Sequence, residues 1–130
     1  RVAIEGEATH YARFRGGAAL LRADETLELV SPDGSRSVLA HESDPPAQDA
    51  QSSLLYVSRY GIESELHRLG RGGDDEVLAQ GLVGIGVLAP QRDGRVLFVA
   101  SVNGGVAGLW VADAGGARCI TNCDLRTGEP

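Results

Sequence analysis

Residues 88–121 read LAPQRDGRVLFVASVNGGVAGLWVADAGGARCIT, and this stretch decides the fold class. The apolar run Arg95–Ser101 is typical of a core strand. Asn103-Gly104 follows it and is the strongest short hairpin signal, so we expect Gly108–Asp113 to pair back onto the first strand. Gly115-Gly116 then indicates a further turn before a short third strand. The stretch therefore predicts a small antiparallel sheet.

Looser copies of this unit precede it in the chain. Leu54–Ser58 aligns with Val96–Ala100 at a spacing of 42 residues, and Val77–Ala79 aligns with Cys119–Thr121 at the same spacing. Val38–Ala40 lies 39 residues before Val77–Ala79 and has a similar pattern. Repeats of about 40 residues with several strands each are typical of β-propeller blades, which bury their faces by stacking on neighbours. We therefore expect three units, at about residues 10–40, 49–79 and 82–121.

These patterns predict an all-β fold of antiparallel, propeller-type blades, with a small β-sandwich or barrel as the alternative. Helix signals are poor, because glycines or strand-like alternation interrupt every long window that could carry an amphipathic helix. Propellers usually close with about 4–8 blades, whereas 130 residues hold about three. The chain is therefore interpreted as a single all-β domain, or as part of a larger propeller completed by further blades or copies.

The third unit resembles the repeat of TolB-type (PD40/WD40-like) β-propellers. The usual form of that repeat is a Pro-Asp-Gly turn, an apolar strand, a hairpin, a strand followed by two glycines, and a short strand ending in Thr. Gln91 and Arg92 separate the proline from Asp-Gly here, which departs from that form. Such repeats occur in periplasmic binding proteins, peptidase-associated propellers and lectin-like modules, so the resemblance implies a fold and no particular activity. The matching positions are Pro90, Asp93, Gly94, Phe98, Leu109, Trp110, Asp113, Gly115, Gly116 and Thr121.

The charge of the chain argues against nucleic acid as a partner. The net charge is −6, Lys is absent and the Arg residues are scattered, whereas a phosphate-backbone surface needs clustered basic residues. No apolar run approaches the roughly 20 residues that cross a bilayer, so we expect no membrane insertion. The exclusive use of Arg as the basic residue indicates a GC-rich, bacterial source. The chain begins at Arg1, which suggests a processed or excised segment of a periplasmic or extracellular protein.

Two polar turns contain side chains that are able to bind a metal ion. His41, Glu42 and Asp44 lie in the most polar stretch of the chain, and Asp74 and Asp75 form an acidic turn. The loop with His41 could hold a metal ion. Calcium would suit the acidic turn, although that turn lacks the regular alternation of oxygen ligands found in calcium loops. The alternative is that both turns are simply solvated surface, and no other cofactor is expected.

Two further pairs of residues are candidates for structural or interface roles. Cys119 and Cys123 have C-x-x-x-C spacing and could form a disulfide in an oxidising compartment. The alternative is a core-facing Cys119 and a free thiol at Cys123. Tyr60 and Trp110 are candidate interface aromatics, with packing between blades as the alternative for Trp110. His67 alternates with leucines and is expected to be a partly exposed strand histidine.

Catalysis by this chain is not expected from its motifs. It has no G-x-S-x-G elbow, and no serine has a neighbouring histidine in the sequence. We interpret the chain as a non-catalytic interaction module of an exported protein that binds a protein or peptide through loop faces. The alternatives are a carbohydrate- or metal-binding module, and an accessory propeller segment of a larger hydrolase.

Overall fold

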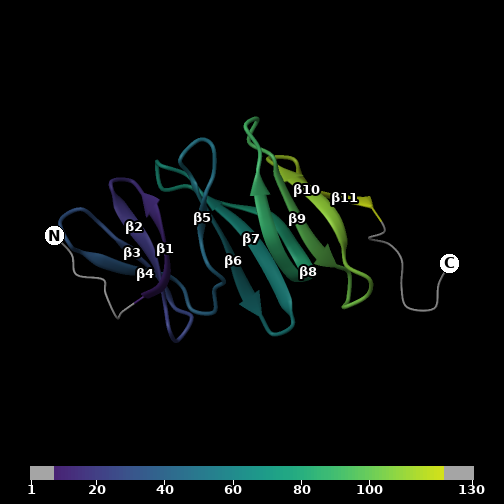
Figure 1. Ribbon diagram of the computed structural model, residues 1–130, viewed down its shortest axis with the longest axis horizontal. Helices are drawn as coiled ribbons and strands as arrows, with labels where there is room; N and C mark the ends of the chain where they lie inside the picture. Colours follow the sequence, from purple (N-terminus) through teal and green to yellow (C-terminus); the bar gives the residue numbers. More distant parts are fainter. Residues whose placement is uncertain (1–7, 122–130) are drawn as a thin grey trace.

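The structure is a computed structural model that describes residues 8–121. These residues form two antiparallel sheets and contain no helix, which confirms the expected all-β class. The first sheet has the order β1-β2-β3-β4, so each strand pairs with the next one along the chain (Figure 1). Its strands are β1 (Ala8–Phe14), β2 (Gly17–Arg22), β3 (Leu27–Val30) and β4 (Arg36–Ala40).

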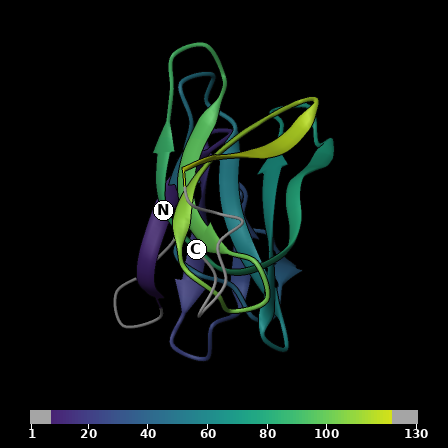
Figure 2. The ribbon, with the colours of Figure 1, turned by 90° about the vertical axis from the view of Figure 1, so that its right-hand side faces the viewer.

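The second sheet has seven strands in the order β11-β10-β9-β8-β7-β6-β5. The two sheets follow one another along the longest axis of the molecule, as Figure 1 shows. In Figure 2 the outermost strand β11, drawn in yellow, is inclined to the green strand β9, as expected for a twisted sheet. The strands are β5 (Ala47–Gln48), β6 (Leu54–Tyr60), β7 (Glu63–Leu69), β8 (Asp75–Pro90), β9 (Val96–Ser101), β10 (Gly108–Asp113) and β11 (Gly116–Thr121).

The strand β8 differs from the sequence expectation. The sequence favours two separate strands here, Glu76–Ala79 and Leu82–Leu88, divided at Gln80-Gly81, and the nearly continuous apolar run of the second predicts burial on both faces. Instead, the first part of β8 pairs with β7 and the second part pairs with β9, so one bent strand joins the hairpins on either side. Positive φ angles at Gly81, Gly84 and Val87 accompany register shifts along it, which is how bulges bend a strand without ending it. Burial on both faces is wrong, since the Val87 side chain is 80% exposed.

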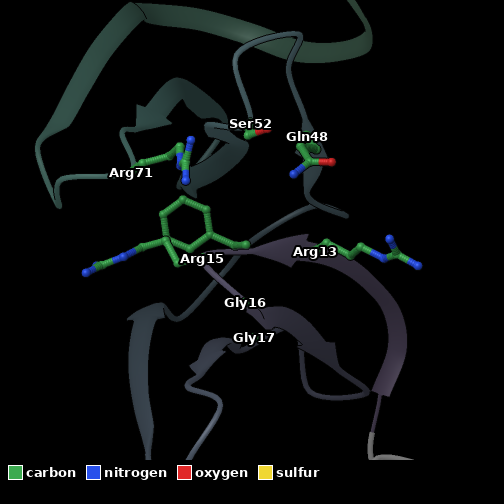
Figure 3. A pocket seen from close by; sticks show the side chains of 8 residues that line it. Arg13, Arg15, Gly16, Gly17, Gln48, Ser52 and Arg71 are labelled. Atoms are coloured by element: carbon green, nitrogen blue, oxygen red, sulfur yellow. The ribbon is translucent and has the colours of Figure 1, made fainter.

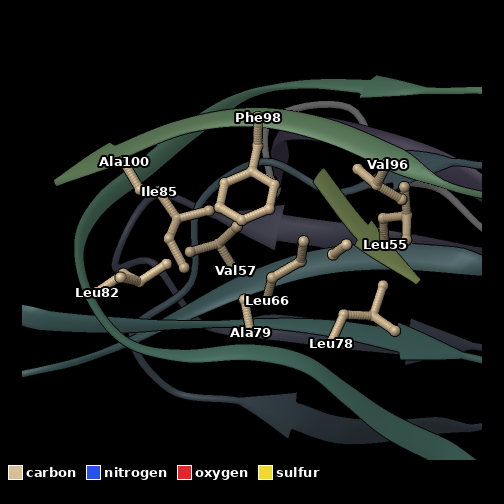
Figure 4. Packing of buried hydrophobic residues seen from close by; sticks show 11 residues of the cluster. Leu55, Val57, Leu66, Leu78, Ala79, Leu82, Ile85, Val96, Phe98 and Ala100 are labelled. Atoms are coloured by element: carbon tan, nitrogen blue, oxygen red, sulfur yellow. The ribbon is translucent and has the colours of Figure 1, made fainter. Parts of the chain in front are cut away.

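Two apolar cores lie on opposite faces of the β6–β7 hairpin. Successive residues of a strand point to opposite faces, and Leu55 and Val57 accordingly belong to the core shared with β8, β9 and β10, which we name the large core (Figure 4). Leu54 and Tyr56 belong to the core shared with β1, β2 and β3, which we name the small core. The hairpin is therefore buried on both sides.

No helix able to span a membrane occurs within residues 8–121.

Candidate functional site

A cavity of about 490 Å³ lies where the end of β4 faces the β6–β7 hairpin and the start of β8. We name it the His67 cavity. Its walls combine the polar segment after β4 with side chains that project from the small-core face of the hairpin. The lining residues are Leu39, Ala40, His41, Glu42, Tyr56, Ser58, Arg59, Tyr60, His67 and Asp75.

Strand pairing places His67 at the centre of this site. Tyr56 on β6 is the register partner of His67 on β7, so the two rings stand side by side on one face. Their centroids are 4.6 Å apart and their planes differ by 6°, which is a stacked arrangement. His67 is only 7% exposed. The expectation of a partly exposed histidine is therefore wrong, because the small core and β8 cover this face.

Both ring nitrogens of His67 have polar neighbours. Nδ1 lies 3.2 Å from Oδ1 of Asp75, at the start of β8. Nε2 lies 3.1 Å from Oε1 of Glu65 and 3.1 Å from Oγ of Ser58. A buried imidazole needs partners for its nitrogens, and these carboxylates provide one on each side. A doubly protonated ring could donate to both carboxylates at once.

Tyr56 is fixed by the same network. Its hydroxyl donates to Oδ2 of Asp75 at 2.7 Å, so Asp75 accepts contacts from Tyr56 and His67 with its two oxygens. Burial raises the pKa of the Tyr56 phenol, and the hydrogen bond to Asp75 raises it further. The phenol therefore stays neutral, and able to donate, to a higher pH than an exposed tyrosine does.

Ser58, His67 and Asp75 follow the order of a serine-hydrolase relay, but the contacts of Nε2 oppose that chemistry. No serine is adjacent to a histidine in the sequence, but strand pairing brings Ser58 close to His67, because Ser58 is the register partner of Glu65, two residues before His67. General-base activation requires an Nε2 lone pair that accepts the serine proton. The Glu65 carboxylate lies at an equal distance from Nε2, and because an ionised carboxylate only accepts, a hydrogen bond to it uses an N–H at Nε2. The arrangement is better suited to structure and binding than to acyl transfer.

Arg59 on β6 connects the segment after β4 to the β6–β7 hairpin. Its guanidinium contacts the carboxylates of Asp44 and Glu25. The backbone adds further bonds, since Arg59 N donates to Glu42 O at 2.7 Å and Asp44 N donates to Val57 O at 2.9 Å. These contacts hold one wall of the cavity in place. The positive charge of Arg59 is paired with carboxylates of the protein.

The structure brings four of the expected site residues to this one cavity: His41, Glu42, Asp75 and Tyr60 line it. Asp44 does not line the cavity but forms an ion pair with Arg59, which does. Asp74 does not line the cavity either. Within residues 8–121, no group of three or more His, Cys, Asp or Glu side chains is placed to hold a metal ion. The calcium site stays a prediction without a ligand set in this part of the chain.

The other predicted residues lie away from the cavity. Trp110 is half-buried, its Nε1 donates to Ala100 O at 3.2 Å, and it contacts Phe98 at the edge of the large core. Cys119 lies in β11, whereas Cys123 lies outside the described residues, so the disulfide stays a prediction.

Sequence reasoning missed the centre of the site. Tyr56 and Ser58 are two residues apart, as are Glu65 and His67, so each pair lies on one face of its strand. Their periodicity could have shown a polar patch on the β6–β7 hairpin. It could not show which face was covered, or that Asp75 would approach from β8.

Comparisons with protein-family models, with curated proteins and with solved structures found no match for this chain. The resemblance to TolB-type repeats therefore stays a prediction based on the residues of the third unit.

Proposed function

We propose that this chain is a non-catalytic interaction module that binds a protein or peptide partner at the His67 cavity. The observation that carries this proposal is the exposed Tyr60 at the border of the cavity, 59% exposed at the end of β6. Ile62 follows in the adjoining turn and is 76% exposed. An aromatic and an aliphatic side chain beside a polar cavity are the combination that interface anchors use.

The polar lining supports binding rather than turnover. His67, Tyr56 and Asp75 satisfy one another, so they form a preorganised wall that needs no rearrangement when a partner arrives. His41 and Glu42 are exposed on the opposite wall and have free surface for contacts with a partner. A peptide side chain could enter the cavity while its backbone lies along Tyr60.

We also propose the finer architecture, namely propeller-type blades of an exported periplasmic or extracellular protein, completed by further blades or copies. The burial of both faces of the β6–β7 hairpin supports this proposal, because stacking on both sides is what an inner blade requires. Light scattering and small-angle scattering of the chain test it. A ring-shaped assembly agrees with the proposal, whereas a compact monomer of 13.6 kDa favours a sandwich or barrel.

A selection from a random peptide library tests the binding proposal. Peptides enriched on the wild-type chain should lose affinity for Tyr60→Ala by about tenfold or more, the size expected for an aromatic hot spot. Tyr11→Ala is the matched control, because Tyr11 is 63% exposed and does not line the cavity. Equal binding by both variants would contradict the proposed site. Specific glycan-array hits without peptide enrichment would favour the carbohydrate alternative.

A further inference from the structure

A second cavity, of about 540 Å³, lies at the β1–β2 hairpin (Figure 3). Its other walls come from β5, from the turn before β6 and from the turn between β7 and β8. The lining residues are Arg13, Phe14, Arg15, Gly16, Gly17, Gln48, Ser52 and Arg71. Three of them carry a positive charge and none carries a negative charge, so we name this the arginine cavity.

The charges of this cavity are unusual for the chain. Arg22, Arg36, Arg59, Arg68, Arg95 and Arg118 all form ion pairs with carboxylates. No such pair holds Arg13, Arg15 or Arg71 within residues 8–121. The net charge of the chain is −6, yet three guanidinium groups without acidic partners border one cavity. Among residues 8–121, they provide the only charges that line this cavity.

Arg15 occupies a backbone conformation that is unfavourable for arginine. Phe14 pairs with Gly17, which leaves Arg15 and Gly16 as a two-residue hairpin loop. Their φ angles are 53° and 78°, so both adopt the left-handed conformation of a type I′ turn. The first loop position favours Asn, Asp or Gly, and a residue such as Arg is strained there. The turn would form more readily with asparagine at position 15, so the guanidinium is present despite a conformational penalty.

We propose that the arginine cavity binds a phosphate group carried by a small molecule or a side chain. Guanidinium groups form paired hydrogen bonds with phosphate oxygens, and a dianion can engage several of them together. The Ser52 hydroxyl and the Gln48 amide add neutral donors on the opposite wall. A volume of about 540 Å³ exceeds what one phosphate fills and lies in the usual range of ligand sites, so part of the carrier enters as well.

The three arginine side chains surround the cavity without converging on one point. In Figure 3, Arg13 and Arg15 extend to opposite sides of the hairpin, and Arg71 faces them from the other wall. Arg15 also lies over the Phe14 ring, with 5.9 Å from Cζ to the ring centroid, which leaves its N–H edges open. All three arginines are exposed, so their side chains can rotate inward around the anion. Ordering these side chains opposes binding, and inorganic phosphate alone should bind in the millimolar range.

Titration of the chain with inorganic phosphate and with phenyl phosphate, followed by NMR and calorimetry near pH 8, tests the proposal. Arg15→Asn and Arg71→Gln should each weaken phenyl phosphate binding by about tenfold or more, the loss expected for one charged hydrogen-bonding group. Arg15→Asn should also raise the midpoint of thermal unfolding by ~2–4 °C, because Asn suits the turn better. Loss of binding in a more stable variant cannot result from misfolding.

Arg92→Gln is the matched control, because Arg92 is exposed in the turn before β9, lies outside the cavity and has no acidic partner within residues 8–121. It should bind phenyl phosphate as the wild type does. Absence of saturable phosphate binding, or an equal loss in Arg92→Gln, would overturn the proposal. Tighter binding of citrate than of phenyl phosphate, with the same dependence on Arg15 and Arg71, would assign the site to carboxylates instead. None of these outcomes depends on peptide binding at the His67 cavity.

Discussion

The two faces of the β6–β7 hairpin differ in composition, because one packs into the large core and the other combines small-core residues with a polar cluster around His67. Leu55, Val57 and Leu66 point into the large core and pack with other apolar side chains there. The opposite face carries Tyr56 and His67, together with the polar groups that satisfy them. The apolar face needs volume and shape, whereas the polar face needs a specific partner for every buried group. The same two strands thus provide a scaffold on one side and a candidate binding site on the other.

The largest expected effect is on the apolar face. Leu66→Ala should lower the free energy of unfolding by about 2–5 kcal/mol, because it removes a fully buried side chain and leaves a cavity. Urea denaturation followed by circular dichroism measures this. Ile62→Ala is the control, since that side chain is exposed in the turn of the same hairpin. A loss below about 1 kcal/mol for Leu66→Ala would mean that the large core is not closely packed.

A smaller effect is expected on the polar face. His67→Ala should lower the free energy of unfolding by about 1–3 kcal/mol, because Ser58, Glu65 and Asp75 lose a shared partner in a largely buried setting. The same denaturation experiment applies, with the exposed His10 replaced by Ala as the control. An unchanged stability in His67→Ala would show that water replaces the imidazole without penalty.

The pH dependence of stability gives an independent view of the polar face. The folded-state pKa of Tyr56 lies above its ordinary value of 10.0, because burial and then Asp75 disfavour the phenolate. The stabilisation is therefore complete below pH 10 and is lost above it, as the unfolded chain releases a proton that the folded chain keeps. The free energy of unfolding should fall by about 1.4 kcal/mol per pH unit in that range. Tyr56→Phe should flatten this dependence, and an equal slope in both proteins would contradict the burial of the phenol.

The smallest effect is expected at the border of the cavity. Tyr60→Ala should change the free energy of unfolding by no more than about 0.5 kcal/mol, because the side chain is largely exposed. Thermal melting of this variant beside Tyr11→Ala measures it. A loss comparable to that of His67→Ala would mean that Tyr60 is part of the folded scaffold rather than a surface for a partner.

Local sequence patterns predicted the turns well. Ser31-Pro32-Asp33-Gly34 is a strong turn signal in the sequence, and Gly34 N donates to Ser31 O at 2.9 Å in that turn. Asn103 and Gly104 both have positive φ, as their hairpin signal predicted. Such turns depend on the conformational preferences of two to four adjacent residues. The prediction for β8 was wrong because Gly81 was treated as the end of a strand, while neighbouring strands on both sides hold the bent chain in one sheet.

The sequence by itself determined the all-β class, the positions of most hairpins and the alternation that gives β6 and β7 two faces, since these follow from residues close together in the chain. Only the tertiary structure decided which face packs into the large core and which carries the polar cluster around His67. The pairing of Tyr56 with His67 and the approach of Asp75 join residues on neighbouring strands, and the meeting of Arg13 and Arg15 with Arg71 at one cavity joins segments that are far apart in sequence. The reason is physical: burial and charge pairing depend on what lies across a sheet or a gap, and local sequence does not encode that neighbour.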